Sequence, residues 1–233
     1  MLYNIIDRVY IGHIPGEGSM ALTGVGVCMP LILIIAAFAA LVGIPVGSPR
    51  ASIYMGKGEH DTAEKILTGC LSLQIIVSII LTVILLIWNE NLLLMFGASE
   101  KYDFLCDGIY DIYAIGTIFV QITLGMNTFI TAQGKAITGM MTVLIGAVAN
   151  IILDPIFIFG MHMGVRGAAL ATVISQALSC IWVLSFLSGK RRCFGSKRNI
   201  MPGLQLVPPC VALGASMFVM QASESVISVC FNS

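Results

Sequence analysis

The chain has 233 residues, of which 58% are hydrophobic and only 10% are charged, and its mean hydropathy is +0.96. Soluble proteins carry about 25% charged residues, so this composition excludes an ordinary water-soluble domain and indicates an integral membrane protein. The 12 basic and 12 acidic side chains cancel, so no net field would attract nucleic acid, and the high hydrophobic content excludes a disordered chain.

The first segment, 1–14, is apolar but too short to cross a membrane, and it carries Asp7 and Arg8. No basic stretch precedes it and no small-residue cleavage site follows it, so it is not a secretory signal. We interpret it as the second half of a helix.

Five apolar runs follow, and each is long enough to cross a bilayer. A helix needs about 20 apolar residues to span a hydrocarbon core of roughly 30 Å. The runs are 22–49, 66–88, 112–134, 136–165 and 167–189, and their only charged residue is Asp154 in the fourth. They are apolar all round and do not alternate with period two, so the expected fold is an all-α membrane protein, a helical bundle with no β-barrel.

The last segment is apolar around Glu224 and then stops, so it predicts a partial seventh helix. Three regions are therefore expected: a transmembrane bundle with a truncated first helix over 1–189, a basic cytoplasmic loop over 190–207, and the start of a second lobe over 208–233.

The loop charges predict the orientation of the bundle. Alternate connections hold nine basic residues, whereas the other connections hold only Lys101 and Arg166. By the positive-inside rule, the first set lies in the cytoplasm of a multi-pass protein of the plasma membrane. The nine are Arg50, Lys57, Lys65, Lys135, Lys190, Arg191, Arg192, Lys197 and Arg198.

The sequence offers little for enzymatic or metal chemistry. Its seven cysteines include no C-x-x-C pair and are expected to be buried as small apolar side chains. His13, His60 and His162 fall in three different connections, so a zinc site is not expected. No nucleophile elbow, P-loop or dinucleotide fingerprint occurs, so we expect neither an enzyme nor an organic cofactor.

Three carboxylates in apolar segments are functional candidates, because an ionisable group at membrane depth is costly. They are Asp7, Asp154 and Glu224. Asn150 lies four residues before Asp154, which places the two on one face of a helix. Pro155 follows directly and is expected to bend the helix, because it cannot donate a backbone hydrogen bond.

Counting from the outer turns places three polar residues at one depth. Asp154 lies eight residues before His162, Thr172 lies ten after it, and Asp7 lies eight before Pro15. At about 1.5 Å per residue, the three fall within roughly 3 Å of the same height. Together with the amide of Asn150 they would form an oxygen-rich cage, which suits Na⁺, while close carboxylates suit H⁺ equally well.

Several stretches resemble the multidrug and toxic compound extrusion (MATE) family over the whole chain. The more specific ones are Asn-Ile-Ile-Leu-Asp-Pro within 149–160 and Gly-x-x-Gly-Ala-Ala-x-Ala-Thr over 164–172. Residues 2–13 and 51–59, with Ala63-Glu64-Lys65, are also similar to the family.

The resemblance implies two six-helix lobes that open alternately to each side while a cation gradient drives export of amphipathic or cationic organic compounds. The family's first-lobe cation site corresponds to Asp7, Asn150, Asp154 and Thr172. Tyr3 matches a cavity position that contacts substrate, and Glu224 matches an acidic residue used in coupling. On this basis the chain is expected to be a truncated first lobe whose partner is the missing second lobe.

Three other functions are considered. A flippase of lipid-linked oligosaccharides has related architecture, but it would line its cavity with basic residues, whereas these spans carry acids. A non-transporting interaction subunit would use its polar residues only as helix-packing contacts. An intramembrane enzyme is disfavoured, because no nucleophile and base share a depth.

Overall fold

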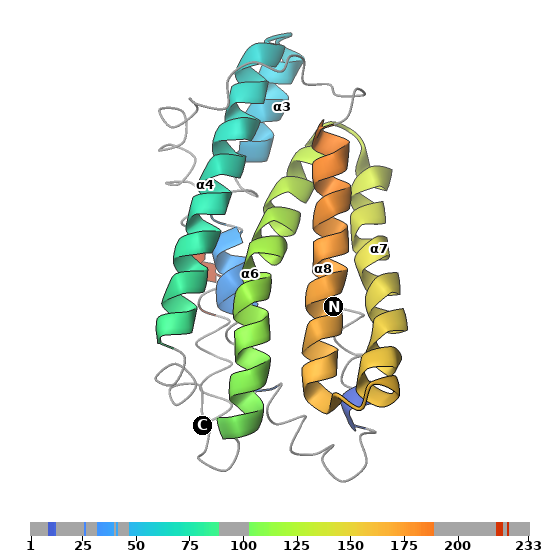
Figure 1. Ribbon diagram of the computed structural model, residues 1–233. Helices are drawn as coiled ribbons and strands as arrows, with labels where there is room; N and C mark the ends of the chain where they lie inside the picture. Colours follow the sequence, from blue (N-terminus) through green and yellow to red (C-terminus); the bar gives the residue numbers. More distant parts are fainter. Residues whose placement is uncertain are drawn as a thin grey trace.

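The computed structural model describes residues 9–12, 26, 32–39, 41, 47–88, 103–188, 218–220 and 223. All regular secondary structure within these ranges is helical. The elements are α3 (Ser48–Gly56), α4 (His60–Ile87), α6 (Asp103–Ala132), α7 (Ala136–Pro155), the π-helix η2 (Ile156–Gly160) and α8 (Gly164–Ser188). The long helices lie side by side in a bundle in which α6 contacts α3, α4, α7 and α8 (Figure 1).

Four helices have the length and composition to cross a membrane: His60–Ile87, Ile109–Ala132, Ala136–Gly160 and Gly164–Ser188. They correspond to four of the five runs predicted from the sequence. The remaining run, 22–49, is described only in part, with helix over 32–39 and from Ser48. The prediction of an all-helical, multi-pass membrane protein is therefore confirmed.

The helix α7 shows how a bilayer sorts side chains. Its outward positions are apolar: Ile137 is 73% exposed and Ile152 is 55% exposed. Its buried positions are Gly139, Thr142, Gly146, Asn150 and Asp154. This arrangement reverses the pattern of soluble helices, because hydrocarbon on the outside accepts apolar side chains and leaves polar and small residues for contacts between helices.

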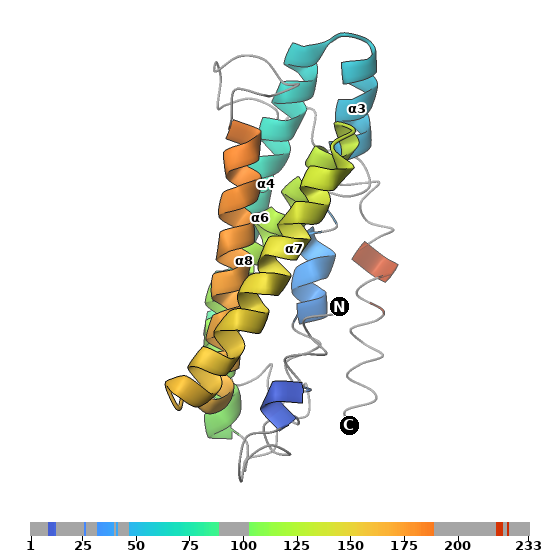
Figure 2. The same cartoon turned by 90° about the vertical axis from the view of Figure 1, so that its right-hand side faces the viewer.

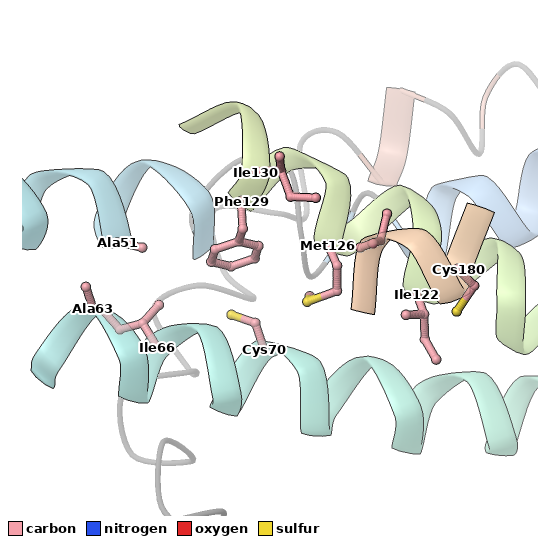
Figure 3. Close-up of a cluster of buried hydrophobic side chains, with 10 residues drawn as sticks. Ala51, Ala63, Ile66, Cys70, Ile122, Met126, Phe129, Ile130 and Cys180 are labelled. Carbon is pink, nitrogen blue, oxygen red and sulfur yellow. The ribbon is translucent and has the colours of Figure 1, made fainter. Parts of the chain in front are cut away.

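One apolar cluster joins α3 and α4 to α6 and α8. Its buried members are Ala51, Ala63, Ile66, Cys70, Ile122, Met126, Phe129, Ile130, Cys180 and Val183. Figure 3 shows Cys70 of α4 pointing toward Met126 and Phe129 of α6. Cys70 and Cys180 pack as small apolar side chains, as the sequence predicted.

Two buried amides link α4 and α6 to the helical segment 32–39. The Gln74 Nε2 atom donates hydrogen bonds to the backbone oxygen of Gln121 at 3.0 Å and to its Oε1 atom. The Gln121 Nε2 atom donates in turn to the carbonyl oxygen of Ile35 at 2.9 Å. Water does not compete for these bonds inside the bundle, so they fix the three segments relative to one another.

The α-helical pattern of α7 ends at Pro155, where the sequence predicted a bend. Proline has no amide hydrogen for the carbonyl of Ile151, so the regular hydrogen-bond ladder is interrupted there. The next five residues wind more widely as η2, in which the Met161 nitrogen donates to the Ile156 oxygen at 2.9 Å. The change of helix type comes directly after Pro155, one residue beyond Asp154.

A tight turn then brings α8 back against η2. The turn has a positive φ angle at Gly164 (55°), which a glycine adopts easily, and another at His162 (53°). At the start of α8, a Cβ atom on Gly167 would lie 2.8 Å from both the carbonyl carbon and the oxygen of Phe157. Only glycine allows this approach, and the approach fixes the position of α8 beside α7 (Figure 2).

Replacing Gly167 with valine is expected to destabilise the bundle. The added carbons would overlap the backbone of η2, and overpacking of this kind costs about 1–3 kcal/mol. The melting temperature of the purified protein in detergent should fall. Gly160→Ala is the control, since a Cβ there meets no atom within 4 Å. Equal melting temperatures for the two variants would contradict the close contact.

Candidate functional site

The centre of the site is a buried pair on α7. Asn150 is 1% exposed and Asp154 is 0% exposed. The Asn150 Nδ2 atom donates a hydrogen bond to Asp154 Oδ1 at 3.1 Å. Residues four apart on a helix share a face, so the helical geometry of α7 alone brings the amide and the carboxyl together. The sequence-based placement of this pair on one face is confirmed.

A cavity of about 330 Å³ lies between α6, α7 and α8, and Asn150 forms part of its wall. Thr172 of α8 lines the same cavity. Asp154 is not among the lining residues, so Asn150 stands between the cavity and the carboxyl group. The polar side chains of the wall are Thr123, Asn127, Thr128, Thr142, Asn150, Thr172, Ser175, Gln176 and Ser179.

The wall of the cavity offers oxygen atoms as hydrogen-bond acceptors. The Thr172 hydroxyl donates to the carbonyl oxygen of Ala168 at 3.0 Å, which leaves its oxygen lone pairs available. The Asn150 Oδ1 atom is buried and accepts no hydrogen bond from the described residues. Neither basic nor acidic side chains occur among the lining residues. Such a surface can bind a small cation or a ligand that donates hydrogen bonds.

The helical segment 9–12 packs one turn away from this site. Ile11 is buried in a cluster with Ile158 of η2 and Ala168 of α8. Ile158 follows Asp154 by four residues and Ala168 precedes Thr172 by four, so the cluster borders the polar level on two helices. The segment 9–12 therefore contacts the bundle one helical turn from the level of the predicted ligands.

The structure brings together three of the residues predicted from the sequence and leaves three outside the described residues. Asn150, Asp154 and Thr172 lie on adjacent helices, α7 and α8. Asp7, Tyr3 and Glu224 lie outside the described residues, as do the loop 190–207 and most of 208–233. Within the described part of the chain, no group of three or more His, Cys, Asp or Glu side chains could hold a metal.

Apart from Asn150 and Thr172, the residues that line the cavity were not predicted from the sequence. Asn127 of α6 and Gln176 of α8 line the cavity, but neither carries a charge that makes it conspicuous in an apolar run. On α8 the spacing of the polar residues was a signal in the sequence. Each lies three or four residues from another: Thr172, Ser175, Gln176 and Ser179. Such spacing places them on one side of the helix.

The family model MatE matches residues 1–156. The chain belongs to the MatE family. Its relatives include the multidrug export protein MepA of Staphylococcus haemolyticus, 26% identical over 100% of this chain and 51% of that protein. MepA of Staphylococcus aureus is 23% identical over 94% of this chain and 48% of its own length.

Solved MATE transporters have the same fold as this MatE chain. The MATE multidrug transporter DinF-BH matches with a TM-score of 0.91 and 27% identity, covering 100% of this chain and 52% of that one. An outward-facing MATE transporter of the MOP superfamily matches with a TM-score of 0.86 and 26% identity, over 97% of this chain and 49% of that one. The chain thus spans about half the length of the relatives it matches.

Replacing Asn150 with leucine is expected to lower the free energy of unfolding by about 1–3 kcal/mol, because the buried Asp154 carboxyl loses a donor while the side-chain volume is kept. Thr172→Val is the control, since it removes only a hydroxyl bonded within its own helix. Thermal unfolding in detergent measures both. A larger loss for Thr172→Val would contradict the assigned hydrogen bond.

Proposed function

We propose that this chain forms one lobe of a cation-coupled antiporter that exports amphipathic or cationic organic compounds. One observation supports this proposal above the others: the carboxyl of Asp154 is fully buried at membrane depth and connects through Asn150 to a cavity lined by oxygen atoms. A buried intramembrane carboxyl is costly, and proteins keep such groups for ion or proton pathways. The proposed direction of transport and the proposed class of cargo are based on the relatives named as multidrug exporters and transporters.

The coupling ion would bind at Asp154, Asn150 and Thr172, with Asp7 as the fourth ligand. Asp7 precedes Ile11 by four residues in the sequence, and Ile11 packs beside the turns that carry the other three. Carboxylate, amide and hydroxyl oxygens are hard ligands that suit Na⁺, and the same carboxylates can take up H⁺. No organic cofactor is part of the proposal.

Coupling requires that the two conformations of the transporter bind the ion with different affinity. Binding of Na⁺ or H⁺ at Asp154 and Asp7 would reduce the negative charge beside the cavity. A cationic cargo is then held less tightly and is released on the outer side. Tyr3 and Glu224 are proposed to contact cargo in the cavity between this lobe and a second lobe.

The proposed location is the plasma membrane, with the basic connections in the cytoplasm. In this orientation the α6–α7 turn, which carries Lys135, faces the cytoplasm, and the turn at His162 faces outward. The second lobe would close the other side of the cargo cavity, as the length of the relatives suggests.

A flippase for lipid-linked oligosaccharides is the less favoured alternative. Pyrophosphate requires basic side chains, and no lysine or arginine occurs among the residues that line the described cavity. A non-transporting interaction subunit would use Asn150 and Asp154 only for helix packing, and its function would tolerate neutral replacements of the same volume.

Asp154→Asn is expected to abolish gradient-driven dye efflux from membrane vesicles that carry the intact transporter. The neutral amide has no negative charge to bind a cation and cannot take up a proton. Insertion into the membrane should be unchanged. Asp111→Asn is the matched control: its carboxyl lies on α6 and is exposed, and efflux should continue at the wild-type rate. Wild-type efflux by Asp154→Asn would overturn the coupling assignment.

A further inference from the structure

The buried face of α7 contains no apolar side chain. Its five members, Gly139, Thr142, Gly146, Asn150 and Asp154, recur at intervals of three or four residues. At about 1.5 Å per residue, this face extends roughly 22 Å along the helix, from near the α6–α7 turn to the carboxyl group. Gly139, Thr142 and Gly146 are small enough to serve helix packing alone, but Asn150 and Asp154 continue the same face and are not packing residues of that kind.

The two glycines of this face make room for oxygen atoms of the neighbouring helices. A Cβ atom on Gly146 would lie 2.6 Å from the Ser179 Oγ atom of α8. A Cβ atom on Gly139 would lie 3.2 Å from Thr131 Oγ1 and 3.4 Å from Asn127 Oδ1 of α6. The glycines thus let polar groups of α6 and α8 approach the α7 backbone closely, and Gly146 also lines the open space of the cavity of about 330 Å³.

The hydroxyl groups along this space all direct their hydrogens to backbone carbonyls. Thr142 donates to Thr138 at 3.3 Å, Ser175 donates to Ala171 at 2.7 Å, and Ser179 donates to Thr142 at 3.0 Å. Their oxygen lone pairs remain as acceptors. The space therefore offers acceptors to cations and to hydrogen-bond donors.

Two amide oxygens at different heights of the space lack hydrogen-bond partners among the described residues. Asn127 Oδ1 and Asn150 Oδ1 are both buried and accept no hydrogen bond there. At the α6–α7 turn, the buried Gln133 Nε2 atom donates none to the described residues. Each such group costs about 1–3 kcal/mol unless water or an ion satisfies it. A cavity of about 330 Å³ with these polar partners has room for several waters.

We propose that this polar seam, which consists of Gly139, Thr142, Gly146 and Asn150 with Asn127 and Ser179, is a hydrated path inside the lobe. Along it the coupling cation or proton moves between the α6–α7 turn and the Asn150–Asp154 pair. The ion then reaches Asp154 without passing through the opening between lobes. The inference rests on the proposed cation coupling, and it adds a separate entrance for the ion.

Thiol accessibility in lipid nanodiscs tests the path directly. Thr142→Cys should react with a small, hydrophilic, cationic methanethiosulfonate reagent, although the native side chain is only 1% exposed. Ile152→Cys is the lipid-facing control and should not react, whereas Thr131→Cys, at the exposed end of α6, should react readily. Peptide mass spectrometry resolves each site from the seven native cysteines. An unreactive Thr142→Cys variant would overturn the hydrated path.

Narrowing the entrance shows from which end the reagent arrives. Adding Gly139→Val should slow the labelling of the Thr142→Cys variant by about tenfold or more, because the new side chain fills the space beside Asn127. In the same background Ile152→Cys should still not react, which confirms that the bundle remains folded in the membrane. Asn127→Leu keeps the volume but removes the polar oxygen, and it should slow labelling in the same way if Gly139→Val does not fold.

Unchanged labelling in both backgrounds would mean that the reagent enters from the cargo side, and the proposed path would be wrong. The assay needs neither a gradient nor a cargo. Its failure would therefore leave the coupling role of Asp154 intact, and loss of that role would leave the labelling pattern intact. The two proposals can be separated by these readouts.

Discussion

Hydrocarbon around the bundle is the constraint on which the rest of the structure depends. A lipid-facing surface cannot satisfy polar groups, so the middle of a spanning helix presents apolar side chains outward and places its polar side chains against other helices. On α7 the separation is complete, with Ile137 and Ile152 outside and Asn150 and Asp154 inside. The hydrophobic surroundings that hold α7 in the membrane therefore also place its side-chain oxygen atoms on the face that packs against other helices.

The membrane spans and the central pair could be predicted from the sequence because each depends on local geometry. Uncharged runs of sufficient length are helices in a bilayer, and four of the five are described as such. Asn150 and Asp154 are four residues apart on one helix, so their contact follows from helical spacing alone. Pro155 likewise predicts an interruption of the regular helix, because it lacks a backbone donor, although the sequence indicated a bend and not the π-helix that follows.

The contacts between helices could not be predicted, because they depend on how the surfaces fit. Nothing in the sequence indicates that Gly167 touches the backbone of Phe157, or that Gly146 leaves room for the hydroxyl of Ser179. Nor does it indicate that Gln74 pairs with Gln121, since an isolated glutamine in an apolar run has many possible partners. Such contacts between helices shape the cavity, so the residues that line it could be identified only from the three-dimensional structure.

The hydrogen bonds of Gln74 and Gln121 restrict movement within the lobe. Hydrogen bonds are directional, so the amide chain from Gln74 through Gln121 to Ile35 resists sliding of α4, α6 and the segment 32–39 past one another. Ile11 instead meets Ile158 and Ala168 through apolar surfaces, which allow small shifts at little cost. The described part of the lobe thus combines a hydrogen-bonded frame with apolar packing at Ile11, and small shifts at that packing can occur while the frame keeps its shape.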